Sequence, residues 1–123
     1  MCKPQILIAE DDYAMRTFLD TALRRAGYVV NAFPSGDAAS ASAGRDGYGL
    51  LLTDIDMPGM DGVDLARQLT NISPGLRVLF VTGFTERAHQ ASDVLAQGAR
   101  VLSKPFKLAD LIGQVENMIK TKG

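Results

Sequence analysis

The sequence has one cysteine and one histidine among its 123 residues, Cys2 and His89. A single thiol excludes an internal disulfide and a zinc site built from several cysteines, and it favours a reduced, cytoplasmic setting. A histidine without companions excludes a catalytic or metal-binding histidine cluster. We therefore interpret His89 as a solvated helix residue and Cys2 as an inert thiol.

The sequence also lacks an excess of either charge and any long hydrophobic run. Thirteen basic residues against fourteen acidic ones give a formal net charge of −1, so we expect no nucleic-acid partner. The longest apolar runs, such as Val78–Val81, are as short as strands, and Met1–Pro4 lacks the apolar stretch of a signal peptide. We therefore expect no membrane attachment. With 46% hydrophobic residues, the composition favours one domain with its own core over residues 1–123.

Two hydrophobic patterns alternate along the chain. Continuously apolar runs, typical of buried strands, occur at Gln5–Ala9, Val29–Phe33, Leu50–Thr53, Leu76–Val81 and Ala99–Leu102. Helical spacing of apolar residues predicts helices at Met15–Ala26 (with Gly27 as its stop), Val63–Leu69, Ala88–Leu95 and Leu108–Ile119. The Ala- and Ser-rich segment Ser35–Ala43 is interpreted as a further helix. This alternation predicts an α/β fold, a (βα)5 doubly wound five-stranded parallel sheet of the flavodoxin-like type.

The carboxyl ends of the predicted strands carry most of the reactive side chains. Ligands bind beyond these ends in open α/β sheets, and the sequence places there Glu10-Asp11-Asp12, Asp54-Ile55-Asp56, Thr82-Gly83 and Ser103-Lys104. Carboxylates held together repel one another, and a hard divalent cation such as Mg²⁺ removes that repulsion. A carboxylate beside Mg²⁺ can attack phosphorus, while an ammonium and a hydroxyl can bind phosphoryl oxygens. The pattern therefore predicts phosphoryl transfer at this edge of the sheet.

These motifs, in register on successive strand ends, make the sequence resemble the receiver domain of two-component response regulators over essentially its whole length. The resemblance implies that Asp54, in the segment Asp54-Ile55-Asp56-Met57-Pro58-Gly59-Met60-Asp61-Gly62, is the phosphoacceptor. It implies that Thr82 and Lys104 bind the phosphoryl group. It also implies a CheY-like fold, and a histidine kinase or histidine phosphotransferase as the upstream partner.

The same resemblance implies a cofactor and one unusual peptide bond. Mg²⁺ would be held by the carboxylates of Glu10, Asp11 and Asp54 and by the main-chain carbonyl of Asp56. The bond between Lys104 and Pro105 would be cis, which a proline tolerates.

A narrower resemblance is to the stand-alone, single-domain receivers of bacterial cell-cycle control. It is carried by the stretches Ile6–Asp12, Leu51–Asp54, Val81–Phe84 and Val101–Phe106. It implies a regulator that is phosphorylated through a phosphorelay. Its unphosphorylated form would act as an adaptor by engaging an ATP-dependent protease through the AAA+ unfoldase. A receiver domain cut from a larger regulator or hybrid kinase stays open as the alternative.

Two further acidic residues are interpreted as helix caps rather than ligands. Asp12 precedes the first predicted helix, and Asp61 precedes the helix that contains Val63. Asp56, two residues after Asp54, has two interpretations. It is either a solvated carboxylate or a charge that changes the lifetime of the acyl phosphate by orienting or repelling water.

Three other positions bear on how such a protein would switch. Arg16 is interpreted as part of a solvated helix face, with contact to a phosphodonor as the alternative. Many receivers carry Tyr or Phe three residues before the lysine, whereas Val101 stands here, so coupling needs another group, for which Phe84 is a candidate. The outer face of Leu108–Ile119 is the candidate partner surface.

Two other functions compete with the receiver interpretation. Asp54-Ile55-Asp56 also fits the nucleophile motif of a haloacid-dehalogenase-type phosphohydrolase, but such an enzyme needs an acidic cluster downstream, and the acids here lie upstream. A flavin binder of the flavodoxin type would need a phosphate-binding loop after the first strand, where three acids stand. We therefore predict no enzyme activity beyond self-directed phosphoryl transfer and autodephosphorylation.

Overall fold

The computed structural model describes residues 5–43, 47–83, 88 and 91–120, and it contains one parallel sheet. Its five strands are β1 (Gln5–Ala9), β2 (Val29–Phe33), β3 (Leu50–Thr53), β4 (Arg77–Thr82) and β5 (Arg100–Ser103). Their order is β2-β1-β3-β4-β5, and every neighbouring pair is parallel. The doubly wound prediction is therefore confirmed.

The first three strands have the predicted bounds, and the last two begin and end one residue later than predicted. The apolar run before β4 includes Leu76, but its N–H donates to Ser73 O at 2.9 Å and so closes a turn. Ala99 likewise donates to Val94 O at 3.2 Å, in the turn that precedes β5. Hydropathy alone does not separate such turn residues from the ladder.

The helices are α1 (Tyr13–Arg25), α2 (Gly36–Ala43), α3 (Gly62–Ile72), α5 (Ser92–Ala96) and α6 (Leu108–Lys120). Both predicted caps are confirmed, because the Asp12 carboxylate accepts from Met15 N at 2.9 Å and the Asp61 carboxylate from Asp64 N at 2.8 Å. Gly27, with φ of 99°, follows α1 as predicted. The predicted helix Ala88–Leu95 lies partly outside the described residues, within which α5 begins at Ser92.

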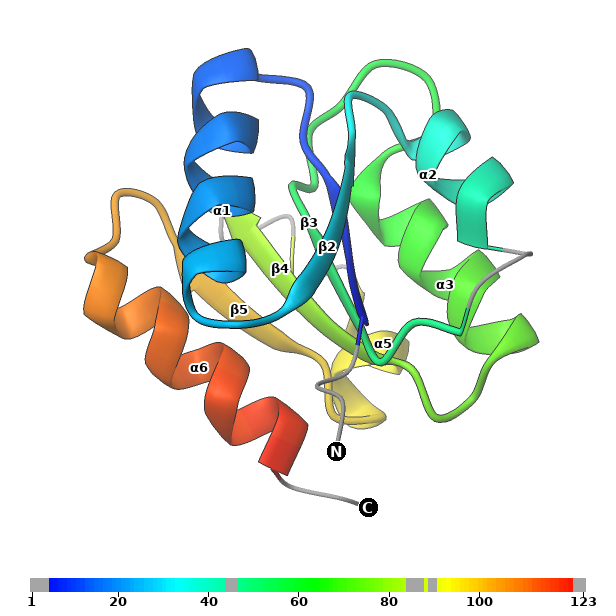
Figure 1. The fold of residues 1–123 in the computed structure, drawn as a ribbon. Helices are drawn as coiled ribbons and strands as arrows, with labels where there is room; N and C mark the ends of the chain where they lie inside the picture. The colour runs from blue at the N-terminus through cyan, green and yellow to red at the C-terminus, as the bar shows by residue number, and fades with distance from the viewer. Residues whose placement is uncertain (1–4, 44–46, 84–87, 89–90, 121–123) are drawn as a thin grey trace.

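Two hydrophobic layers enclose the sheet. Figure 1 shows α1 and α6 on one side of the strands and α2 and α3 on the other. Along β1, Ile6 and Ile8 face the α1 and α6 side, while Leu7 faces the α2 and α3 side. All three are fully buried, and each such side chain contributes about 1.5–3 kcal/mol to stability. This burial on both faces explains why the central strands are continuously apolar in the sequence.

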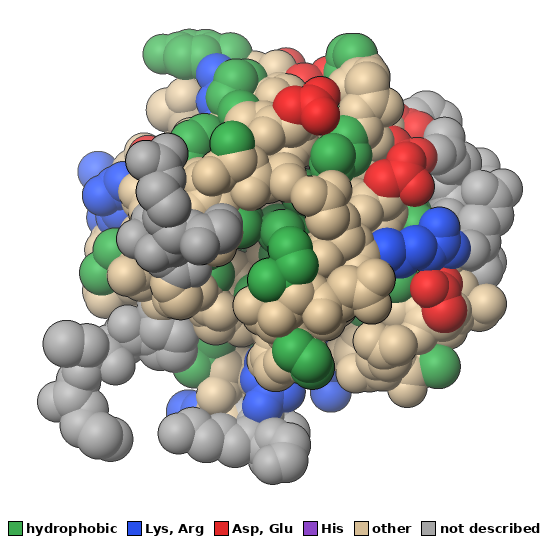
Figure 2. Space-filling model, turned by 90° about the vertical axis from the view of Figure 1, so that its right-hand side faces the viewer, with side chains coloured by type: hydrophobic (Ala, Val, Ile, Leu, Met, Phe, Trp, Pro, Cys, Tyr) green, Lys and Arg blue, Asp and Glu red, His purple; other side chains and the backbone are tan. Residues whose placement is uncertain are grey.

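Among the described residues, few charged side chains lie at the centre of the surface over α2 and α3. Figure 2 shows this side of the molecule, where acidic and basic side chains lie mostly around the rim of the view. Within the described part of the chain, no helix combines the length and the apolar content that crossing a membrane requires.

Candidate functional site

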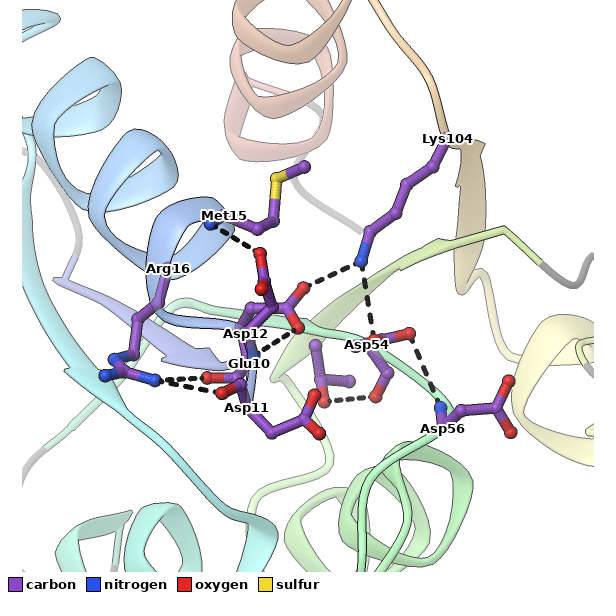
Figure 3. Close-up of polar contacts among 9 residues, drawn as sticks. Glu10, Asp11, Asp12, Met15, Arg16, Asp54, Asp56 and Lys104 are labelled. Atoms are coloured by element: carbon purple, nitrogen blue, oxygen red, sulfur yellow. Dashed lines mark hydrogen bonds and ion pairs between the residues drawn. The ribbon is translucent and has the colours of Figure 1, made fainter.

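Three of the predicted site residues come directly after strands, and the hydrogen-bond ladder of the sheet continues through them. Glu10 N donates to Phe33 O at 3.0 Å, Asp54 N to Ala9 O at 3.0 Å, and Lys104 N to Thr82 O at 2.9 Å. Their main chains are therefore fixed by neighbouring strands. As a result, the side chains of residues far apart in the sequence converge at one edge of the sheet (Figure 3).

The three carboxylates of Glu10, Asp11 and Asp54 form one cluster. Each offers an oxygen, and these oxygens all lie within 4.8 Å of one another. Glu10 is 1% exposed and Asp54 is 9% exposed, whereas Asp11 lies at the surface. Clustered carboxylate oxygens with an exposed member fit a hard divalent cation that keeps water ligands, as Mg²⁺ does. These residues could therefore hold a metal.

Lys104 brings a positive charge to the cluster. Its Nζ donates to Glu10 Oε1 at 2.9 Å and to Asp54 Oδ2 at 3.4 Å. Burial lowers the pKa of Lys104, but the hydrogen bond that Lys104 donates to Glu10 and the charges of Glu10 and Asp54 outweigh it, so the pKa is raised. The ammonium form is therefore favoured in the pocket.

The Glu10 carboxylate is held at both oxygens. Oε1 accepts from Lys104 Nζ, and Oε2 accepts from Asp12 N at 3.2 Å. Burial raises the pKa of Glu10; the two hydrogen bonds oppose this rise and the charge of Asp54 adds to it. Glu10 is thus a buried acid whose side chain is held in place by Lys104 and by the main chain of Asp12.

Asp54 is held firmly by its main chain and loosely by its side chain. Oδ1 accepts from Asp56 N and Oδ2 from Lys104 Nζ, both at 3.4 Å, near the limit for a hydrogen bond. By contrast, the Thr53 hydroxyl donates to Asp54 O at 2.8 Å in a buried setting. The carboxylate is therefore anchored at its base while its oxygens are weakly engaged, which suits a nucleophile.

Gly62, which opens α3, packs directly on the main chain of Asp54. A Cβ added to Gly62 would lie 2.0 Å from Asp54 O, and Gly62 N donates to Ile55 O at 2.9 Å. Only a glycine fits this approach. Neither Gly62 nor Thr53 was predicted to support the site, because nothing in the local sequence shows which backbone a small residue will meet in the fold.

Thr82 and Asp56 lie at the same edge but in different settings. Thr82 is fully buried and ends β4, the strand beside β3. Figure 3 shows the Asp56 carboxylate directed away from Asp54, and it lines a polar hollow of about 420 Å³ that also includes Asp61. The side chain of Asp56 is therefore outside the carboxylate cluster, and its carbonyl as a ligand stays a prediction.

Arg16 is only partly solvated, because its side chain also binds the main chain of the preceding turn. It is half-buried, and its Nη1 donates to Glu10 O at 2.9 Å and to Asp11 O at 3.5 Å. The spacing of six residues between Glu10 and Arg16 could have predicted this contact. It places the arginine in the first turn of α1, from where its side chain can fold back over the preceding turn. Its guanidinium lies against the main-chain carbonyls of Glu10 and Asp11 (Figure 3), and contact to a phosphodonor stays a prediction.

The remaining predicted positions have mixed outcomes. The Lys104–Pro105 bond is cis, as predicted. Val101 is partly buried and packs against the core on the α2 and α3 side. On the candidate partner helix α6, Leu111 is buried while Leu108 is 50% exposed. The predictions for Cys2, Phe84 and His89 fall outside the described residues.

Comparisons with known proteins give concordant matches. The family model described as the response regulator receiver domain matches residues 6–116. A relative from Brucella abortus, the response regulator receiver protein CpdR, is 47% identical over 94% of this chain and 96% of its own length. The C4-dicarboxylate transport transcriptional regulatory protein DctD of Rhizobium meliloti is 33% identical over 89% of this chain, which spans only 24% of that protein. Among solved structures, chemotaxis protein CheY4 of Vibrio cholerae superposes with a TM-score of 0.85 at 25% identity, covering 95% of this chain and 99% of that one.

Proposed function

The chain belongs to the response regulator receiver domain family, and from this premise we propose that it is a phosphorelay switch whose phosphoacceptor is Asp54. The observation that carries the proposal is the convergence of Glu10, Asp11, Asp54 and Lys104 in one cluster of side chains. We propose that the 123 residues act as one receiver domain in the cytoplasm, with a histidine kinase or histidine phosphotransferase upstream.

The donor set of the carboxylate cluster fits Mg²⁺. We propose that Glu10, Asp11 and Asp54 hold the ion through carboxylate oxygens and that Asp56 adds its main-chain carbonyl. When bound, the ion supplies positive charge that offsets the negative phosphoryl oxygens. Lys104 supplies a second positive charge from the β5 side, where it already contacts both Glu10 and Asp54.

In the proposed step, a carboxylate oxygen of Asp54 attacks the phosphorus of the donor. The new oxygen–phosphorus bond forms as the bond to the donor breaks, and the donor leaves with the electron pair. Lys104 then binds a phosphoryl oxygen and the hydroxyl of Thr82 binds another. In autodephosphorylation, water attacks the phosphorus, and the bond to Asp54 breaks to give the carboxylate and inorganic phosphate.

This chemistry is self-directed, and its product is a changed surface. The phosphoryl group adds roughly −1.5 to −2 charges beside Lys104 and Thr82. Because Thr82 ends β4 and Lys104 follows β5, a shift of either would change the face formed by α5, β5 and α6. The face formed by these elements is the proposed output surface.

We propose further that the chain is a single-domain adaptor in cell-cycle control. The unphosphorylated form would engage the AAA+ unfoldase of an ATP-dependent protease. This is supported by 47% identity to a receiver protein, CpdR, of which the chain covers 96%. The alternative is a receiver within a larger regulator, which the match to one quarter of DctD favours.

The phosphoacceptor is tested by labelling with acetyl phosphate and Mg²⁺. We expect the intact protein to gain the mass of one phosphoryl group, and Asp54→Ala to gain none. Asp93→Ala is the matched control, because Asp93 is an aspartate on α5 whose partner is Arg67, and it should label as the wild type does. Labelling that persists in Asp54→Ala would contradict the assignment.

The adaptor role needs a separate measurement. The phosphorylated and unphosphorylated forms are each tested for retention on an immobilised AAA+ unfoldase. We expect retention of the unphosphorylated form and loss of retention after phosphorylation. Equal retention of both forms would argue against a phosphorylation-dependent adaptor while leaving the receiver chemistry intact.

A further inference from the structure

Arg16 binds the main chain of the residues that precede it. Its Nη1 donates to Glu10 O at 2.9 Å and to Asp11 O at 3.5 Å, and its main-chain N–H donates to Asp12 O at 2.9 Å. One residue on α1 thus donates to three successive carbonyl oxygens. These belong to the turn that carries the first two members of the carboxylate cluster.

Other bonds also hold this turn, among them the one from Asp12 N to Glu10 Oε2 at 3.2 Å, and Arg16 adds to them. Glu10 is tied to β2 through Phe33 O, and Asp12 is tied to α1 through Met15 N. Between them lies Asp11, which is exposed and whose carbonyl receives only a long contact of 3.5 Å from Arg16, so the bond of 2.9 Å from Arg16 to Glu10 O is the main restraint that Arg16 adds. The direction of the Asp11 carboxylate follows from how its main chain is held.

Tyr13 restrains Arg16 in turn. The guanidinium carbon of Arg16 lies 5.5 Å from the centroid of the Tyr13 ring, a cation–π arrangement. Tyr13 is 73% exposed and belongs to the first turn of α1, so the ring covers the guanidinium at the surface. This contact limits the positions that the long arginine side chain can adopt.

Arg16 and Lys104 also lie on different sides of the cluster. Figure 3 shows Lys104 reaching Glu10 and Asp54 from one side, and the Arg16 guanidinium against the carbonyls of Glu10 and Asp11 on the other. Arg16 contacts main-chain oxygens rather than carboxylate oxygens. Arg16 therefore leaves the carboxylate oxygens available to a cation. Lys104, by contrast, already binds carboxylate oxygens of Glu10 and Asp54.

We propose that Arg16 is a positioning residue for the metal site, fixing the main chain of Glu10 and Asp11 so that their carboxylates are preorganised for a divalent cation. The inference rests on the proposed function, since it assumes that the cluster holds Mg²⁺. Groups that orient metal ligands from behind affect affinity strongly, and their loss typically weakens metal binding by about 10–100-fold.

The test is a calorimetric titration of the 123-residue protein with Mg²⁺ alone, without a phosphodonor. We expect Arg16→Ala to raise the Kd for Mg²⁺ about tenfold and Arg16→Lys about threefold, because an ammonium can still donate but does not stack on the Tyr13 ring as a guanidinium does. Tyr13→Ala should raise the Kd by a smaller factor than Arg16→Ala, and Tyr13→Phe should leave it unchanged, since the ring is kept.

Arg24→Ala is the matched control. Arg24 also lies on α1 and also donates to a main-chain carbonyl, that of Val30, but this contact is remote from the cluster. Thermal unfolding without metal should show that Arg16→Ala and Arg24→Ala each lose some stability. Only Arg16→Ala should lose Mg²⁺ affinity, which separates positioning of the site from general support of the helix.

The outcomes distinguish this inference from the proposed function. A wild type that binds no Mg²⁺ overturns the metal site itself. A wild type that binds Mg²⁺, with Arg16→Ala binding at the same Kd, overturns the role of Arg16 alone. Should Arg16→Ala fail to fold, Arg16→Lys decides, and a Kd equal to that of the wild type would refute the proposal.

Discussion

Replacing Gly62 by alanine should damage stability and phosphoryl transfer together. The added Cβ would lie 2.0 Å from Asp54 O and 2.8 Å from the Asp54 carbonyl carbon, and real Cβ atoms essentially never approach closer than 3.0 Å. To bring this contact from 2.0 Å to at least 3.0 Å, the start of α3 and the end of β3 must move apart. Since both contacting groups are main chain, neither can move aside as a side chain would.

The magnitude follows from two effects. Forcing an extra carbon into a packed site costs about 1–3 kcal/mol, and we expect about 3 kcal/mol because rigid backbone stands on both sides. A misplacement of a reacting group by about 1 Å can slow a reaction by about a hundredfold. The Asp54 carboxylate, already 3.4 Å from Lys104 Nζ, would move relative to its neighbours.

The assays are urea unfolding and the initial rate of labelling by acetyl phosphate. Gly113→Ala is the matched control, because Gly113 lies within α6 and a Cβ there meets nothing within 4 Å. It should gain about 1 kcal/mol, since alanine favours a helix interior over glycine by that amount. If Gly62→Ala unfolded and labelled like the wild type, the close approach to Asp54 would not control the site.

The remaining predictions concern single carboxylates. Asp61→Ala should lower the free energy of unfolding by about 1 kcal/mol in urea titrations, because the cap of α3 is lost, and an unchanged midpoint would contradict this. The hydrogen bond from Arg67 lowers the pKa of Asp93 in the folded protein. The pair therefore stabilises the fold at pH values above the unfolded pKa of about 3.9, and this stabilisation is lost as the pH falls through the lower pKa of the folded state. The stability difference between wild type and Asp93→Asn should accordingly be constant near neutral pH and shrink in acid, and a difference that grew in acid would reverse the argument. Asp56→Asn should lengthen the lifetime of phosphorylated Asp54 by a factor of roughly two to five, because the Asp56 carboxylate would no longer orient the attacking water, and one unit charge in water-like surroundings contributes no more than about 1 kcal/mol. Equal dephosphorylation rates would remove any role for the Asp56 charge.

The sequence alone determined the fold and the place of the site. Apolar runs and helical spacing are local patterns, and they predicted the strands to within one residue. The cap roles of Asp12 and Asp61 also followed locally, since a carboxylate before a helix has free N–H groups within reach. Parallel strands must end at one edge, so the convergence of Glu10, Asp54 and Lys104 could be predicted without coordinates.

Only the tertiary structure decided how those groups bond to one another. Lys104 was expected to await a phosphoryl group, but it lies closer to Glu10, 94 positions away, than to Asp54. The return of Arg16 onto the Glu10 carbonyl and the contact of Gly62 with Asp54 were likewise not predicted. Such contacts depend on the relative positions of strands and helices to within a few tenths of an ångström. The periodicity of the sequence does not specify positions that precisely.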